Sequence, residues 1–311
     1  MAKILITESV HPIGPELLTA AGHTVVYADR DMDIIRREIV DADAVLVRII
    51  ELPGSLLATA KNLKIVSKHD VGYDNIDLDY CKSHGIAVTI TPNANSLSVA
   101  EHAFTLMLTL AKNIIPVSNE YRTVGFAAKN HAPGIEMTGK TLGLIGMGRI
   151  GKHILHMCRD GLDMHVIVYD PYISEIPEGV ERVDDLSELL RRADVVTLHC
   201  LLTDETRKLI DRERLALMEP TALLINCARG PIVDEAALIE ALESGRLAGA
   251  GLDVTDPEPV APDSPLFKLP NVIVTPHYAP TTVESATRVS KIAAENINAV
   301  LAGQEPVGRI V

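Results

Sequence analysis

Residues 141–151, TLGLIGMGRIG, decide the fold because a short apolar run is followed there by three glycines at fixed spacing. The run TLGLI is typical of a buried strand, and Gly146, Gly148 and Gly151 follow it in a G-x-G-x-x-G pattern. Gly146 permits a tight turn, Gly148 lets the backbone approach a ligand closely, and Gly151 allows a helix to pack against the strand. The pattern alone is a weak signal, so its surroundings must supply the context.

The next apolar run supplies that context. VIVYD (166–170) ends in Asp170, nineteen residues after Gly151, where a carboxylate can accept hydrogen bonds from the hydroxyls of an adenosine ribose. Together the two segments predict a dinucleotide site, with Arg149 and Ile150 over the phosphates. A glycine turn with an aspartate that caps a helix is the simpler alternative. Asp170 would repel a 2′-phosphate, and DPYIS (170–174) has no lysine or arginine, so we expect NAD rather than NADP.

Short β-rich runs alternate with helical segments along the whole chain, which favours an α/β fold with doubly wound parallel sheets. The segment LSVAEHAFTLMLTLAKNI between the two series is apolar nearly all round, which indicates a helix buried in the protein or against another subunit. The strands are expected at 3–7, 24–28, 44–49, 63–67 and 86–90, and then at 141–146, 165–170, 194–199, 222–227, 249–254 and 271–275.

Composition excludes several classes of function. The net charge of −13 argues against a broad surface for nucleic acid or anionic membrane. No apolar run approaches the ~20 residues that span a bilayer, and the N-terminus has no signal pattern, so we expect a cytoplasmic protein. The four cysteines are far apart, with no paired Cys/His spacing, so we expect neither disulfides nor a metal.

Four residues that bear chemistry follow late strands of the second series: Arg229, Asp253, Glu258 and His277. Transfer of a hydride to a keto acid needs a cation for the carboxylate and carbonyl, and a proton donor for the new alkoxide. Arg229 and His277 supply these groups, and Glu258 can orient the imidazole and raise its pKa. Taken singly, Arg229 also fits a surface salt bridge with Asp234 or Glu235, and Glu258 a solvated loop carboxylate.

These motifs make the chain resemble the D-isomer-specific 2-hydroxyacid dehydrogenases, a family that includes phosphoglycerate, D-lactate and hydroxypyruvate/glyoxylate enzymes. The resemblance covers nearly the whole length. It implies a flavodoxin-like substrate domain (1–98 plus 286–311), a Rossmann NAD domain (99–285) and an interdomain cleft. The segments that carry it are VGYDNIDL (71–78), NSLSVAEHAFTLML (95–108), the glycine motif with Asp170, NCARGPIVDEAALIEALESGRLAGAGLDV (226–254), Glu258-Pro259 and TPH (275–277).

The resemblance also implies roles for single residues. Arg229, Glu258 and His277 match the family's catalytic set, and the amides of Val71 and Gly72 match its receptor for the substrate carboxylate. Arg48 would reach the far end of the substrate, and the segment from Val99 to about Ile114 resembles the family's dimer helix, so we expect a homodimer. Cofactor contacts are implied at Val71, Val99, Arg149, Ile150, Asp170, Cys200, Cys227, Ala228, Asp253 and His277.

The chain departs from the family where many relatives have Ala-Gly before the substrate loop. It has Lys68, His69 and Asp70 there; Asp70 would repel a doubly charged substrate, whereas Lys68 or His69 would bind one. Ordinary solvation of the loop is the simpler interpretation. The sequence predicts NAD-dependent interconversion of an (R)-2-hydroxy acid and its 2-keto acid, with the substrate left open. The alternative is an NAD(H)-responsive binding protein like the co-repressors built on this scaffold; the Arg-Glu-His set does not exclude it.

Overall fold

The computed structural model describes all 311 residues, and these form two compact units. The N-terminal unit comprises Met1–Asn95 and Pro280–Val311, and the central unit comprises Ser96–Ala279. None of the helices is both long enough and apolar enough to cross a bilayer.

The N-terminal unit is built on a five-stranded parallel sheet in the order β2-β1-β3-β4-β5. This order is that of flavodoxin-like folds, so the predicted fold class of this unit is confirmed. Its strands are β1 (Lys3–Ile6), β2 (Thr24–Tyr27), β3 (Ala44–Val47), β4 (Ile65–Lys68) and β5 (Ala87–Thr89). Its helices are α1 (Ile13–Ala20), α2 (Met32–Glu38), η1 (Ile39–Asp41), α3 (Gly54–Leu57), α4 (Leu78–Ser83) and α11 (Val283–Leu301).

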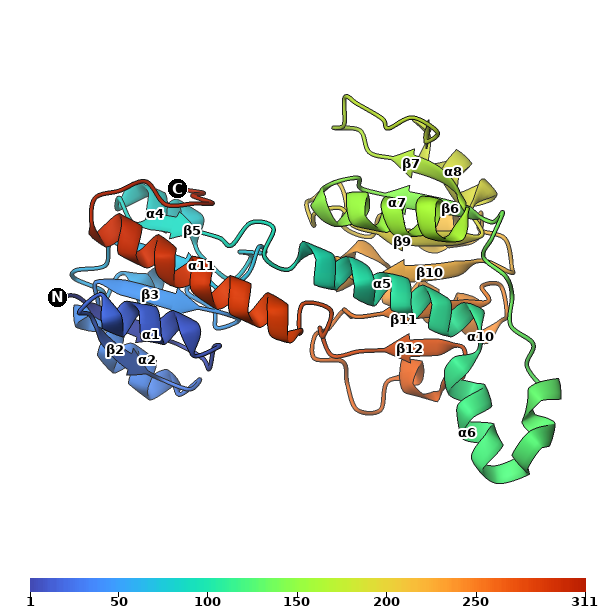
Figure 1. The fold of residues 1–311 in the computed structure, drawn as a ribbon, viewed down its shortest axis with the longest axis horizontal. Helices are drawn as coiled ribbons and strands as arrows, with labels where there is room; N and C mark the ends of the chain where they lie inside the picture. Colours follow the sequence, from blue (N-terminus) through green and yellow to red (C-terminus); the bar gives the residue numbers. More distant parts are fainter. The chain divides into compact units, whose positions relative to one another are not determined.

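Alternation along the strands divides the core of this unit between the two faces of the sheet. Ile4 and Ile6 of β1 pack with Ala293 and Ile297 of α11, whereas Leu5 packs with Ile35 of α2 on the other face. Figure 1 shows α11 lying beside α1 across the sheet. The last helix of the chain therefore completes the core of the first unit.

The central unit is built on a seven-stranded parallel sheet in the order β12-β11-β10-β9-β6-β7-β8. Outward from β6 this is the Rossmann order with one more strand at the far edge, which confirms the predicted fold class. Its strands are β6 (Thr141–Ile145), β7 (His165–Tyr169), β8 (Glu181–Arg182), β9 (Val195–Leu198), β10 (Leu223–Asn226), β11 (Gly249–Leu252) and β12 (Val272–Val274). Only β8 was not expected, because its two residues are charged and exposed and so carry no apolar pattern.

Helices cover both faces of this sheet. One face packs on α5 (Ser96–Ala111) and α7 (Arg149–Leu162), and the other on α8 (Leu186–Arg192), α9 (Arg212–Leu215) and α10 (Glu235–Glu243). α6 (Ile114–Val124) has no buried residue, and with η2 (Gly125–Asn130) it projects from the rest of the unit (Figure 1). The short helices η3 (Gly230–Ile232) and η4 (Pro265–Lys268) lie in the connections beside β10 and β12.

Candidate active site

The strand register of the central unit gathers the predicted site residues at one edge of its sheet. Leu198 of β9 is paired with Ile145 of β6 and Asn226 of β10, and Leu252 of β11 is paired with Asn226 and with Val274 of β12. These residues end their strands, so the loops that follow begin at the same level, which is where ligands collect in open parallel sheets. The loops carry Gly146, Cys200, Cys227, Ala228, Arg229, Asp253, Glu258 and His277.

His277 lies just past β12 in a strained backbone conformation. Its φ of +52° is in the left-handed region, which non-glycine residues seldom adopt. The amide of His277 donates to the carbonyl oxygens of Asp253 (2.8 Å) and Thr275 (3.0 Å). Its Nδ1 lies 2.7 Å from Glu258 Oε1, and because a carboxylate only accepts, Nδ1 carries the proton of this bond. Nε2 is thereby the nitrogen left to exchange a proton with a ligand.

The surroundings of the imidazole favour its charged form. The hydrogen bond to Glu258 raises the pKa of His277 above its usual value; burial and the charge of Arg229 oppose that rise. Arg229 therefore lies close enough to act electrostatically on the imidazole. Its Nη1 donates to its neighbour's carbonyl, Ala228 O, at 2.8 Å. The structure thus brings together Arg229, Glu258 and His277, three of the four residues that the sequence singled out.

Two side chains that the sequence analysis did not place in the site shape this arrangement. Asn226, the last residue of β10, accepts from the Ala228 amide (3.0 Å) and donates to the Arg229 carbonyl (2.9 Å). Glu235 accepts from the amide of Asp256 at 2.9 Å and so fixes the loop that carries Glu258. The sequence signal was present in both cases, since a polar residue ends an apolar strand and a carboxylate follows the motif RGPIVD.

Asp253 is buried, and its carboxylate holds the turn beyond His277. Oδ1 accepts from the Tyr278 amide (2.7 Å) and the Thr275 hydroxyl (2.5 Å), and Oδ2 accepts from the Ala279 amide (2.8 Å). His102 of α5 adds a contact of 3.0 Å from its Nε2 to the Thr275 hydroxyl oxygen. The sequence assigned Asp253 to the cofactor; in the structure its carboxylate is bonded to the protein around His277.

The glycine motif has the geometry that a pyrophosphate requires. Gly146 has a φ of +88°, and a Cβ on it would lie 2.7 Å from the amide nitrogen of Cys200. A Cβ on Gly151 would collide with the carbonyl oxygen of Gly146, whereas a Cβ on Gly148 would meet nothing within 4 Å. Gly148 precedes α7, and no side chain caps that helix, so its first amides are open to an anion.

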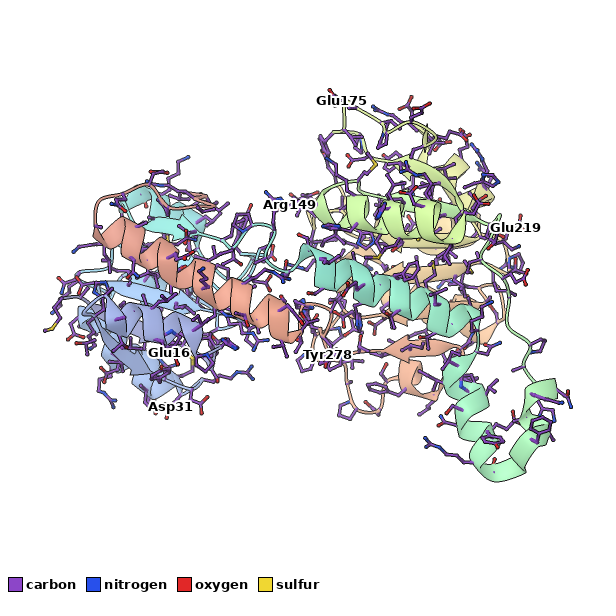
Figure 2. All side chains as sticks on the ribbon, viewed as in Figure 1. Glu16, Asp31, Arg149, Glu175, Glu219 and Tyr278 are labelled. Carbon is purple, nitrogen blue, oxygen red and sulfur yellow. The ribbon has the colours of Figure 1, made fainter.

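Asp170 follows β7 and is tied to the glycine motif. Its Oδ2 accepts from the amide of Met147 at 2.9 Å, and its Oδ1 accepts from the backbone amide of Tyr172 at 3.0 Å. Arg149, the first residue of α7, is exposed at the beginning of the helix (Figure 2), and Ile150 is partly buried. The residues present therefore fit a dinucleotide, with the open space over Gly148 as the place for its phosphates.

The predicted substrate loop belongs to the N-terminal unit. We call residues 69–75 the β4 loop, since they follow β4 at the carboxyl edge of its sheet. The ammonium of Lys68, at the end of β4, donates to the carbonyl of Arg48 and to Asn75 Oδ1, the latter at 2.7 Å. Burial, and to a lesser extent the charge of Arg48, lowers the pKa of His69 to about 4, so this imidazole is neutral near pH 7.

Glu8 is a further residue that the sequence analysis missed in this unit. It is buried after β1, and its carboxylate accepts from the amides of Arg48 (2.8 Å), Ile49 (2.6 Å) and Ile50 (2.9 Å). Only the pairing of β1 with β3 reveals this contact, because forty residues separate Glu8 from Arg48. Glu8 therefore fixes the backbone from which the Arg48 side chain extends.

Three comparisons relate the chain to known proteins. Residues 104–279 match the family described as "D-isomer specific 2-hydroxyacid dehydrogenase, NAD binding domain". The D-3-phosphoglycerate dehydrogenase of Methanocaldococcus jannaschii is 42% identical over 308 residues, which are 98% of this chain and 58% of that protein. The glyoxylate reductase of Thermofilum pendens is 38% identical over 319 residues, covering 98% of this chain and 93% of that protein.

A solved structure shares the fold over the full length. It is the NADPH-dependent glyoxylate/hydroxypyruvate reductase of Sinorhizobium meliloti in complex with NADP and malonate, with a TM-score of 0.90 and 28% identity. The match covers 100% of this chain and 97% of that one. The chain thus spans little more than half the length of the phosphoglycerate dehydrogenase but nearly all of the two reductases.

Proposed function

Because the chain belongs to the D-isomer-specific 2-hydroxyacid dehydrogenase family, we propose that it interconverts an (R)-2-hydroxy acid and its 2-keto acid with NAD. The observation that carries the proposal is the 2.7 Å hydrogen bond between His277 Nδ1 and Glu258, beside the charge of Arg229. This set offers a proton donor, a group that orients it and a cation for an anionic substrate. Those are the groups that reduction of a keto acid requires.

His277 exchanges the proton of the substrate oxygen in this mechanism. In reduction the protonated Nε2 donates to the oxygen on C2, and in oxidation the neutral Nε2 accepts the hydroxyl proton. Glu258 holds the ring in position and stabilises the imidazolium that forms during oxidation. Bound NAD supplies the acceptor or donor of the hydride at C2.

Arg229 and the β4 loop are proposed to hold the substrate carboxylate. A guanidinium forms paired hydrogen bonds with a carboxylate and polarises the adjacent carbonyl. We propose that the amides of Val71 and Gly72 donate to the same carboxylate, and that Arg48 and Lys68 contact the far end of the substrate. Support for the carboxylate contact comes from the Gly72 amide, which has no acceptor in the protein.

NAD is proposed as the cofactor in preference to NADP. The support is the Asp170 carboxylate, fixed beside the glycine motif with no arginine or lysine in residues 170–174. The S. meliloti reductase is named NADPH-dependent, so this preference needs its own measurement. Gly146, Gly148 and Gly151 are proposed to accommodate the pyrophosphate. The remaining proposed cofactor contacts are Val71, Val99, Arg149, Ile150, Cys200, Cys227, Ala228 and Asp253.

The roles of the two units and the assembly are also proposals. We propose that the N-terminal unit is the substrate domain, that the chain forms a homodimer, and that it acts in the cytoplasm. The central unit contains the match to the family's NAD-binding domain, which supports the assignment of the cofactor to that unit.

Turnover of NADH with a panel of keto acids tests the proposal. The panel contains pyruvate, glyoxylate, hydroxypyruvate, 3-phosphohydroxypyruvate and a sulfonated keto acid, each with NADH and with NADPH. We expect oxidation of NADH with at least one of them. His277→Ala should lower kcat on the order of a hundredfold and leave the Kd of NADH nearly unchanged, the usual scale for loss of an acid/base.

Near-normal turnover of His277→Ala would exclude it as the proton donor. No turnover with any keto acid, together with tight binding of NADH, would instead favour the NAD(H)-responsive binding protein that the sequence left as the alternative.

A further inference from the structure

The carboxylate of Asp70 already accepts a hydrogen bond from one of the amides that we assign to the substrate. Asp70 Oδ1 accepts from the amide of Val71 at 2.6 Å and from Asn95 Nδ2 at 2.7 Å. The carbonyl oxygen of Asp70 accepts from the amide (3.0 Å) and the hydroxyl (3.2 Å) of Thr91. Backbone and side chain are thus both fixed, and the negative charge is held at the Val71 N–H.

A substrate carboxylate binds the Val71 amide less favourably while Asp70 is bonded to it. The Val71 amide has a single proton to donate, and two carboxylates that approach it repel each other over a few ångströms. Asp70 is only partly exposed, which weakens the screening of that repulsion by water. A substrate carboxylate must therefore displace Asp70 from Val71, or bind through the Gly72 amide while facing the charge.

We propose that Asp70 weakens substrate binding, because its carboxylate competes with the substrate carboxylate for the Val71 amide and so raises the KM of the substrate. The proposal rests on the proposed function, since it requires this amide to be a substrate contact. The backbone of the β4 loop is anchored at Thr91 through the carbonyl of residue 70, a contact that any residue at this position can make. The Asp70 side chain is therefore not needed for this anchor, and its carboxylate is left with the role at the Val71 amide.

Two substitutions separate the charge from the hydrogen bond. Asp70→Asn keeps an acceptor for the Val71 amide and removes the charge, and Asp70→Gly removes both. With the keto acid that the panel identifies, we expect KM to fall on the order of tenfold in Asp70→Gly, the scale of one hydrogen bond to a charged group, and by less in Asp70→Asn. We expect kcat to stay within about twofold, because the proton donor is unchanged.

Asp79→Asn is the matched control. Asp79 is exposed on α4 of the same unit, so its replacement changes the net charge equally without touching the β4 loop. Its KM should equal that of the wild type, and an equal fall in both asparagine variants would show a general charge effect and overturn the proposal. Thermal unfolding of each variant establishes that it is folded, and if Asp70→Gly is not, Asp70→Asn alone decides.

The two possible failures give different results. Turnover by folded variants with an unchanged or higher KM would show that the Asp70 carboxylate supports the loop, and the inference would fail while the proposed function stands. No turnover of any keto acid by the wild type or the Asp70 variants would refute both. Turnover that appears only in Asp70→Gly would support the competition directly.

Discussion

His277 and Glu258 should control the pH dependence of the reaction. Reduction needs the protonated imidazole, so kcat/KM for the keto acid is highest below the pKa of His277 and falls as pH rises through it. The Glu258 hydrogen bond raises that pKa above the ordinary value of histidine, so the fall lies at a higher pH than for a free imidazole. Glu258→Gln should move the midpoint to lower pH, because it removes an adjacent negative charge. The measurement is the pH profile of kcat/KM for NADH-dependent reduction.

Oxidation provides the internal control for this prediction. It needs the neutral imidazole, so its rate should rise with pH through the same pKa, and Glu258→Gln should shift both profiles in the same direction. Opposite shifts, or a profile that Glu258→Gln leaves in place, would contradict the role of Glu258 as the group that sets the protonation of His277.

Among single residues, the sequence predicted those that bear chemistry and missed those that position them. Arg229, Glu258 and His277 were visible because each follows an apolar strand, and the register brings their strands to one edge. The contacts of Glu8 with the backbone after β3, and of Asp70 with Val71, depend on side-chain directions within a folded loop. No periodicity records such directions, so these contacts could not be predicted.

The turn between β6 and α7 allows a paired test of the cofactor site. Gly148→Ala adds a methyl group where nothing lies within 4 Å, so the protein should remain folded while the Kd of NADH rises on the order of tenfold. Gly146→Ala places a side chain at a φ of +88° and against Cys200, which costs at least ~1–2 kcal/mol of folding free energy. Its unfolding temperature should fall by roughly 5 °C. Calorimetry and NADH titration measure the two effects.

The contrast between the two variants is the control. If Gly148→Ala bound NADH as tightly as the wild type, the space over Gly148 would not be the pyrophosphate site. If it instead lost stability like Gly146→Ala, the weaker binding would follow from misfolding and would say nothing of the ligand.

Elements with an apolar pattern were predictable, and those without one were not. The aliphatic runs identified β1 to β7 and β9 to β12, and the glycine spacing identified the turn before α7. β8 consists of Glu181 and Arg182, whose pairing with β7 comes from the backbone alone. α5 was expected to be buried in the protein or against another subunit. Half of its residues are buried in the structure, and most of these pack in the core of the central unit.

The exposed apolar side chains of α6 and η2 predict that the chain associates with another chain. No residue of α6 is buried, and Ile114, Tyr121 and Phe126 are 54%, 60% and 73% exposed. A projecting arm that bears large apolar side chains is unusual on a monomer and typical of an interface. A second copy of the chain is the expected partner, since the adjoining segment from Val99 resembles the family's dimer helix. We predict a dimer of twice the 33.6 kDa chain mass in sedimentation.

Replacement of Tyr121 and Phe126 together by glutamate should convert this dimer to a monomer, because two buried charges at an interface cost more than the lost apolar contact. Val307→Glu, at a position 63% exposed in the N-terminal unit, carries the same type of change outside the arm and should remain dimeric. A wild-type protein that sediments as a monomer, or a glutamate variant that still dimerises, would exclude the arm as the interface. Because neither side chain bears the proton chemistry, loss of turnover in a folded monomeric variant would further show that the reaction requires the assembled pair.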